Sequence, residues 1–217
     1  MDSFSNAIIE IKNIISKYAG NLCVAECEKI LDSEGRYRTE RSHYSWEDNE
    51  IRMDEKKDTE EYVMTFRHEY GHFADEQLGR PSLQENFRMA IQADFFWYDR
   101  NTDYGEKNLE NLLIELEGSN TFDSRYFSDI LSGIFHNDRF IRDIYDKNGV
   151  AFYGHTNYYW AGISGPEQAV EREVFADLFA IYTENDEEIV AFVENNFPNT
   201  TKQFKKIVGG ANGKSGV

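Results

Sequence analysis

Two histidines, His68 and His72, stand four residues apart, and Glu69 follows the first of them directly. Apolar side chains recur every three or four residues on both sides of this His-Glu-x-x-His motif, so the motif falls inside a predicted α-helix. Residues four apart on a helix lie on the same face, one turn from each other. The spacing therefore constrains the fold strongly, because one helix presents both imidazoles to the same point.

That point suits a zinc ion. Zinc in proteins is bound tetrahedrally, and a catalytic site uses three protein ligands and one open position. Glu69 is placed to take a proton from a water molecule whose pKa the metal has lowered. In a chain with five histidines, composition alone would produce this pattern about once in a hundred such chains. We interpret the motif as a candidate zinc hydrolase site with one Zn²⁺ per chain.

The third ligand is expected on a later helix, predicted from Pro166 to about Thr183. Glu173 and Asp177 lie four residues apart there, in an otherwise apolar stretch, and buried carboxylates are costly without a partner. Zinc ligation by Glu173, with Asp177 bonded to the far nitrogen of a ligand histidine, would satisfy both. Glu171 is the rival ligand, but it lies about 200° around the helix from Glu173, and Asp177 favours Glu173. The alternative is a helix whose carboxylates are simply solvated.

Two more residues of the motif helix bear on the site. Gly71 would let another backbone or a substrate pass close to the helix. Asp75 stands three residues after His72, near the end of the helix. It is either a second-shell acceptor for a ligand imidazole or a surface carboxylate, and the sequence leaves both interpretations open.

Together, the two segments resemble the gluzincin metallopeptidases, in particular the lethal-factor-like group. They are residues 68–75 (HEYGHFAD) and 173–180 (EVFADLFA), which pair His-Glu-x-x-His with a downstream Glu-x-Phe-Ala-acidic-x-Phe helix. That group includes the anthrax lethal factor catalytic domain and the Pro-Pro endopeptidases, and the resemblance covers under half of the chain. It implies that Glu173 is the third zinc ligand and that Glu69 is the general base.

One position departs from that group. Its members place a tyrosine seven residues before the ligand glutamate, where it can stabilise the oxyanion, and this chain has Pro166 there. The loop ahead of the Glu173 helix supplies substitutes a little earlier, namely Tyr158, Tyr159 and His155. Any of the three would be a suitable donor to a developing oxyanion, and the sequence does not choose among them.

The chain is strongly acidic, with 40 acidic residues against 23 basic ones and a formal net charge of -17. This charge repels phosphate backbones and anionic lipids, so we expect no nucleic-acid or membrane partner. For the protein or peptide substrate of a hydrolase, the acidic surface favours a basic one. Solubility alone is the alternative reason for such a charge. The start of the chain lacks the basic and apolar segments of a secretory signal. We therefore expect a cytoplasmic protein. Delivery to another cell, or packaging in a phage particle, stays open. Residues 154–160 and 195–199 resemble metalloprotease-like domains encoded in phage and prophage head-protein regions.

The periodicity predicts a mostly helical α+β fold with a small early β-sheet. The resemblance implies that this fold is a zincin-like metallopeptidase domain. We expect residues 1–208 to form a single domain and residues 209–217 a disordered tail. The two cysteines, Cys23 and Cys27, are expected as reduced, partly buried thiols. Strands are expected at residues 36–38, 43–46 and 50–53. Helices are expected at residues 3–18, 59–79, 108–116, 124–135, 166–183, 186–196 and 199–208, with another opening at residue 82.

The helix that opens at residue 82 has two features of its own. Ser82 and Glu85 resemble a capping box at its start. Four consecutive aromatic residues, Phe95 to Tyr98, follow near its end. A stacking platform is one interpretation of such a run, but beside so many acidic groups we assign it to core packing.

These observations predict a zinc-dependent endopeptidase. His68, His72 and Glu173 would hold the metal, Glu69 would accept the proton of the attacking water, and a loop Tyr or His would bind the oxyanion. One alternative is a non-catalytic binding or structural protein that retains the zinc site, for example a module associated with a phage, a toxin or another effector. A second alternative is an interaction module without metal.

Overall fold

The computed structural model describes residues 3–31, 35–39, 41–54, 59–99, 102–118, 124–135, 159 and 168–211. The α-helices are α1 (Ile9–Tyr18), α2 (Thr59–Gln77), α3 (Glu85–Phe95), α4 (Asp103–Gly118), α5 (Ser128–Phe135), α8 (Ala169–Glu184), α9 (Glu187–Asn196) and α10 (Pro198–Gly210). The 3-10 helices are η1 (Ala19–Asn21), η2 (Pro81–Leu83), η3 (Phe96–Tyr98) and η4 (Ser124–Phe127). The strands are β1 (Cys23–Glu26), β2 (Lys29–Leu31), β3 (Tyr37–Thr39), β4 (His43–Ser45) and β5 (Glu50–Met53). The expected class, a mostly helical α+β fold with a small sheet near the N-terminus, is confirmed.

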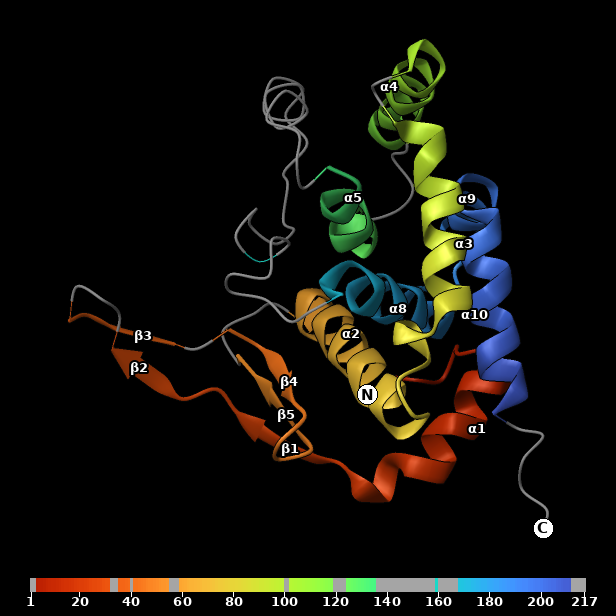
Figure 1. Ribbon diagram of the computed structural model, residues 1–217. Helices are drawn as coiled ribbons and strands as arrows, with labels where there is room; N and C mark the ends of the chain where they lie inside the picture. Colours follow the sequence, from red (N-terminus) through yellow and green to blue (C-terminus); the bar gives the residue numbers. More distant parts are fainter. Residues whose placement is uncertain are drawn as a thin grey trace.

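The helices α2 and α8 lie side by side at the centre of the molecule (Figure 1). The strands lie on one side of this pair, and α3, α9 and α10 lie on the other (Figure 1). Every residue of α8 from Glu173 to Thr183 is buried. A helix that is enclosed on all sides must satisfy its polar groups within the protein. Glu173 and Asp177, the two buried carboxylates of this helix, must therefore have hydrogen-bond or charge partners within the protein.

The sheet next to α2 has three strands in the order β1-β5-β4. β1 pairs with β5 in parallel, and β4 pairs with β5 antiparallel. Ile51 and Met53 of β5 are buried, whereas Glu50 and Arg52 between them are partly exposed and bonded to each other at 2.7 Å. This alternation is typical of a strand with one face on the core. β4 is left as an edge strand beside α2.

Two strands, β1 and β2, were not expected from the sequence. β1 is largely exposed and lacks alternating burial, so its register comes from backbone pairing with β5, a strand about 25 residues away. β2 forms a separate two-stranded sheet with β3.

Both cysteines are free. The expected partial burial is wrong for Cys23, which is exposed, and holds for Cys27.

Aromatic rings dominate the core between α8 and its neighbours. Phe175 contacts Phe204 of α10 edge-on at 5.1 Å between ring centroids, and Tyr182 stacks on the same ring at 5.5 Å. Phe87 of α3 contacts Phe175 from the other direction at 5.8 Å. Most of the buried apolar residues form one cluster that extends from Ala7 to Val208. Among the described helices, none is both long and apolar enough to cross a bilayer.

Three sequence expectations are corrected by the helix boundaries. Ser82 does not cap α3, because its backbone and hydroxyl both bond to Asp75 of α2 and the N-cap position is Gln84. Gly209 and Gly210, assigned to a disordered tail, form the end of α10. The aromatic run after α3 is not all core, since only Tyr98 of its four residues is buried.

Asp94, near the end of α3, caps the first turn of α10. Its fully buried carboxylate accepts hydrogen bonds from the backbone and side chain of both Asn199 and Thr200, at 2.7 to 3.2 Å. Asp94→Ala is expected to lower the free energy of unfolding by about 2–4 kcal/mol, because it leaves these donors unpaired in the interior. Asp186→Ala, at the exposed N-cap of α9, should cost only about 1 kcal/mol. Urea unfolding curves give both values, and equal losses would contradict this role of Asp94.

Candidate metal centre

The candidate centre lies where α2 crosses α8, and Gly71 sets how closely the two helices approach. A Cβ atom at residue 71 would lie 2.7 Å from the Cα of Ala176 and 3.0 Å from the Cβ of Phe179. Beside this contact, the ring of Tyr70 stacks on Phe179 at 5.8 Å. The close backbone approach expected from Gly71 is therefore made by α8. It brings the histidines of α2 within reach of the carboxylates of α8.

His68, His72 and Glu173 converge at this crossing. Oε2 of Glu173 lies 3.1 Å from Nε2 of His68 and 3.2 Å from Nε2 of His72. The two imidazole rings are nearly perpendicular, with centroids 4.9 Å apart. The three side chains offer ligand atoms that all lie within 4.8 Å of one another. The structure thus brings together the three predicted zinc ligands, which come from sequence positions about a hundred residues apart.

Asp177 supports His68 from behind. Its Oδ1 lies 2.9 Å from Nδ1 of His68, and its Oδ2 accepts a hydrogen bond of 3.0 Å from the backbone N–H of Ile130 in α5. A carboxylate on Nδ1 fixes the orientation of the imidazole and leaves Nε2 directed at the ligand position. The predicted contact between Asp177 and a ligand histidine is present. Its anchor on α5 was not foreseen.

Glu69 is buried next to the same group, and β4 holds it in place. Its Oε2 accepts a hydrogen bond of 2.9 Å from the backbone N–H of Tyr44. β4 is an edge strand, so an N–H on its outer side has no partner within the sheet. The bond to Glu69 gives the N–H of Tyr44 a partner and satisfies one carboxylate oxygen. Sequence reasoning missed Tyr44, because a backbone donor carries no residue-type signal.

Of the three loop candidates, Tyr159 lies at the centre, and Tyr158 and His155 lie outside the described residues. The hydroxyl of Tyr159 donates a hydrogen bond to Oε1 of Glu173. Burial, followed by the negative charge of Glu173, raises the pKa of this phenol above its usual range. Tyr159 therefore stays protonated and can act as a donor at neutral pH.

Asp75 and Glu171 are both set apart from this group. Asp75 is buried, and its carboxylate accepts two hydrogen bonds from Ser82, at 2.9 Å and 2.6 Å. Both interpretations of Asp75 are therefore corrected: it is no surface carboxylate, and its bonds anchor η2 rather than an imidazole. Glu171 is partly exposed and does not belong to the cluster of possible ligands, as expected from its angular position on α8.

Negative charge exceeds positive charge at the centre. Burial alone would lower the pKa of His68, but hydrogen bonds to Asp177 and Glu173 outweigh it and hold the pKa well above its usual value. The pKa of His72 is raised as well, because the charge of Glu173 and a hydrogen bond to it outweigh burial. Burial raises the pKa of Asp177 despite its bond to His68. Both imidazoles therefore hold their protons more tightly than a free histidine does, because carboxylates surround them.

Asp129 of α5 joins the same region. It forms a second possible group of metal ligands with His68 and Asp177, again with ligand atoms within 4.8 Å of one another. Its position depends on how α5 packs on α8 (Figure 1), so the spacing along the chain gave no indication of it. The carboxylates around His68 are therefore more numerous than the motif predicted.

Comparison with known proteins adds no relative. No protein-family model matches the chain, and neither the curated proteins nor the solved structures contain a significant match. The functional argument therefore rests on the geometry of the centre itself.

Proposed function

We propose that this chain is a zinc-dependent endopeptidase whose metal is held by His68, His72 and Glu173. The observation that carries the proposal is the convergence of these three donors to within 4.8 Å of one another. Two imidazoles and one carboxylate are a ligand set of catalytic zinc, whereas structural zinc sites use four protein ligands. Within the described residues, this group has no fourth member, and the proposal assigns the fourth position to water and substrate.

Each neighbouring group has a role in hydrolysis. A zinc ion in this position would polarise the scissile carbonyl and lower the pKa of a water molecule toward neutrality. Glu69 would accept a proton from the attacking water and pass it to the leaving amine, so that the C–N bond breaks as the nitrogen is protonated. The N–H of Tyr44 holds Oε2 of Glu69 and leaves Oε1 for the proton. The hydroxyl of Tyr159 is near enough to Glu173 to turn toward a developing oxyanion.

The net charge of the chain bears on the substrate. A formal charge of -17 raises the local concentration of positively charged segments and repels acidic ones. We therefore propose basic protein or peptide segments as the substrate class. The charge does not define which bond is cleaved, because bond preference depends on the walls of the cleft.

The test is cleavage of a complex peptide library by the zinc-loaded chain, read by mass spectrometry of new termini. We expect new termini that disappear with a zinc chelator and return when zinc is restored, with basic residues enriched near the cut. The absence of new termini after verified zinc loading would contradict the endopeptidase proposal. Zinc binding without cleavage would instead support the non-catalytic alternative.

Asp177→Asn tests the support of His68. We expect zinc affinity to fall about 10–100-fold, because the amide no longer stabilises the ligand tautomer as a carboxylate does. Competition with a chelating dye measures this affinity. Glu171→Gln is the matched control. Glu171 lies six residues before Asp177 on the same helix but outside the cluster, so this variant should bind zinc like the parent. An equal loss in both variants would contradict the assignment of Glu173 and Asp177.

A further inference from the structure

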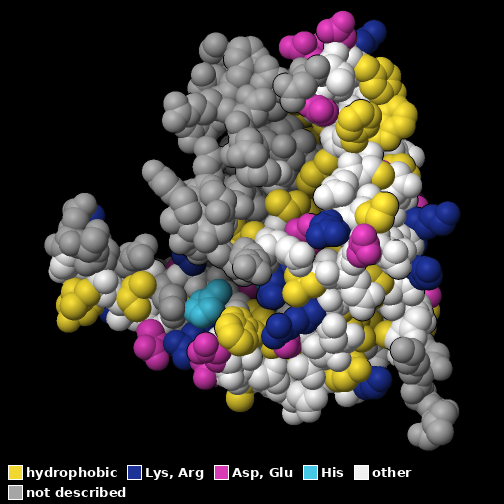
Figure 2. All heavy atoms as spheres, in the orientation of Figure 1, with side chains coloured by type: hydrophobic (Ala, Val, Ile, Leu, Met, Phe, Trp, Pro, Cys, Tyr) yellow, Lys and Arg dark blue, Asp and Glu magenta, His cyan; other side chains and the backbone are white. Residues whose placement is uncertain are grey.

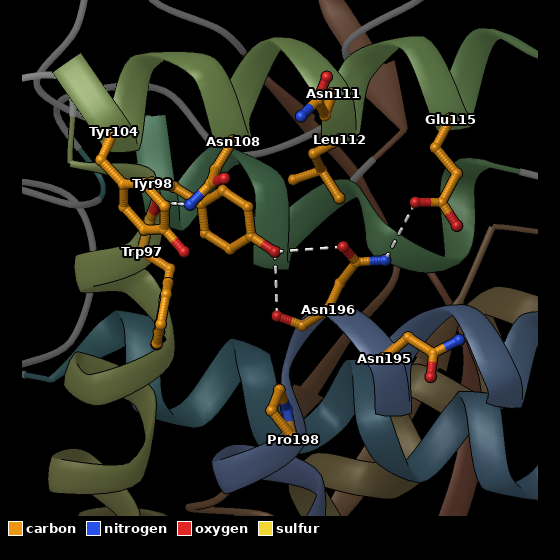
Figure 3. Close-up of a pocket in the computed structure, with 10 residues that line it drawn as sticks. All are labelled: Trp97, Tyr98, Tyr104, Asn108, Asn111, Leu112, Glu115, Asn195, Asn196 and Pro198. Atoms are coloured by element: carbon orange, nitrogen blue, oxygen red, sulfur yellow. Dashed lines mark hydrogen bonds between the residues drawn. The ribbon is translucent and has the colours of Figure 1, made fainter.

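A second site lies between η3, the helix α4 and the end of α9, and it shares no residue with the metal centre. Its cavity has a volume of about 360 Å³, within the size range of small-molecule sites. Figure 3 shows the side chains that surround it, which come from these three elements and from Pro198 at the start of α10. They are Trp97, Tyr98, Tyr104, Asn108, Asn111, Leu112, Glu115, Asn195, Asn196 and Pro198.

One wall of this pocket is aromatic and open to solvent. Trp97 and Tyr104 are 49% and 58% exposed, and their rings contact each other at 5.3 Å with a tilt of 57°. Figure 2 shows hydrophobic side chains gathered at the end of the molecule where α3 ends and α4 lies. Exposed aromatic rings that adjoin a cavity are a feature of binding sites rather than of inert surface. The core packing expected for this run holds for Phe95 and Tyr98, whereas Phe96 and Trp97 are exposed.

The aromatic wall is held by contacts with the start of α4. The amide of Asn108 donates a hydrogen bond of 2.9 Å to the backbone carbonyl of Trp97. Gly105 allows α4 to approach the loop after η3 so closely that a Cβ atom at residue 105 would lie 2.0 Å from the carbonyl oxygen of Asp99. These contacts fix the backbone of η3 relative to the start of α4, which places the rings of Trp97 and Tyr104 beside each other.

The opposite wall is made of side-chain amides and one carboxylate. Asn196 donates to Glu115 at 3.5 Å and accepts from the hydroxyl of Tyr98 at 3.2 Å. The side chains of Asn111 and Asn195 make no hydrogen bond within the part of the chain that the structure describes. Each free amide offers donors and an acceptor side by side. That combination matches hydroxyl groups, which also donate and accept.

We propose that this pocket binds a neutral carbohydrate, with a pyranose ring stacked on Trp97 and Tyr104. The C–H face of a sugar ring is apolar and packs on an aromatic face, while its rim of hydroxyls requires paired donors and acceptors such as Asn111 and Asn195 provide. Anionic ligands are disfavoured, because the described residues that line the pocket include no Lys or Arg but do include the carboxylate of Glu115. The same argument disfavours a nucleic acid, despite the stacking surface.

Saturation-transfer NMR on the full chain tests this proposal with three neutral trisaccharides: maltotriose, cellotriose and triacetylchitotriose. At least one should bind saturably, with a Kd on the order of 1 mM or below. Trp97→Ala should weaken that binding by about tenfold or more, as loss of a central aromatic contact does. Asn195→Ala should weaken it less. Binding should persist in Glu173→Ala, so the outcome is independent of the proposed peptidase activity.

Phe96→Ala is the matched control. Phe96 is adjacent to Trp97 and 68% exposed, but it does not line the pocket, so this variant should bind like the parent. Unchanged circular dichroism would establish that each variant is folded, and Tyr104→Ala provides a second aromatic variant. The proposal is overturned if none of the three sugars saturates, or if folded Trp97→Ala binds as tightly as the parent. Preferential binding of a proline-rich peptide or a single-stranded oligonucleotide at Trp97 would overturn it as well.

Discussion

Glu69→Gln is expected to reduce peptide cleavage by the zinc-loaded chain about 10²–10⁴-fold while leaving zinc bound. A glutamine cannot accept the proton of the attacking water, so the loss falls on kcat. Its side-chain oxygen can still accept the hydrogen bond from Tyr44 that holds Glu69 in the structure, so the fold should be kept. The measurement is kcat and KM on a cleaved peptide, together with zinc content and the thermal midpoint of unfolding.

Glu76→Gln is the control for this prediction. Glu76 lies on the same helix, two turns from Glu69, and pairs with Arg80 away from the candidate ligands. We expect its kcat to match that of the parent. A Glu69→Gln variant that keeps its zinc and more than about a tenth of the parent kcat would contradict the role of Glu69 as the general base. Loss of zinc in Glu69→Gln would contradict the claim that Glu69 is the base and not one of the zinc ligands.

Gly71→Ala is expected to lower the free energy of unfolding by about 1–3 kcal/mol and to weaken zinc binding. The added methyl group would lie 2.7 Å from the Cα of Ala176 and 3.0 Å from its carbonyl oxygen. Backbone atoms cannot move aside as a flexible side chain can, so α2 and α8 must separate. His72 follows Gly71 directly in the chain, and its Nε2 lies 3.2 Å from Oε2 of Glu173 on α8, so the separation disturbs the ligands directly. Urea unfolding and zinc competition measure the two effects.

Gly209→Ala is the matched control for the helix substitution. Gly209 also lies in a helix, but a Cβ atom there would meet nothing within 4 Å. Replacing a helical glycine with alanine in open space should stabilise the protein by about 0.5–1 kcal/mol. The two glycines are therefore expected to respond with opposite signs. A stabilising effect of Gly71→Ala would contradict the close crossing of α2 and α8.

The choice of candidate ligands was predictable, because it depends on short-range patterns, whereas their meeting point depends on the crossing of α2 and α8. The spacing of His68 and His72 places both on one helix face, and the spacing of Glu173 and Asp177 does the same on a second, apolar helix. A buried acidic pair needs cationic or donor partners. The two histidines are suitable partners, and the structure places all four side chains together.

Other contacts could not be predicted, because they depend on packing between distant segments. The bond from Tyr44 to Glu69 uses a backbone N–H, which every residue except proline possesses. Asp129 reaches the centre only because α5 packs on α8. β1 owes its position to pairing with β5 rather than to alternation in its own sequence. Trp97 is exposed and Tyr98 beside it is buried, and a hydrophobic run alone does not distinguish an exposed ring from a buried one.

The central claim is that His68, His72 and Glu173 form one zinc site. Elemental mass spectrometry of the chain purified without added metal, beside Glu173→Ala and Glu171→Ala, tests it most directly. The account predicts one zinc per chain in the parent and in Glu171→Ala, and none in Glu173→Ala. A parent chain that holds no zinc even after reconstitution, or a Glu173→Ala variant that holds as much zinc as the parent, would contradict it.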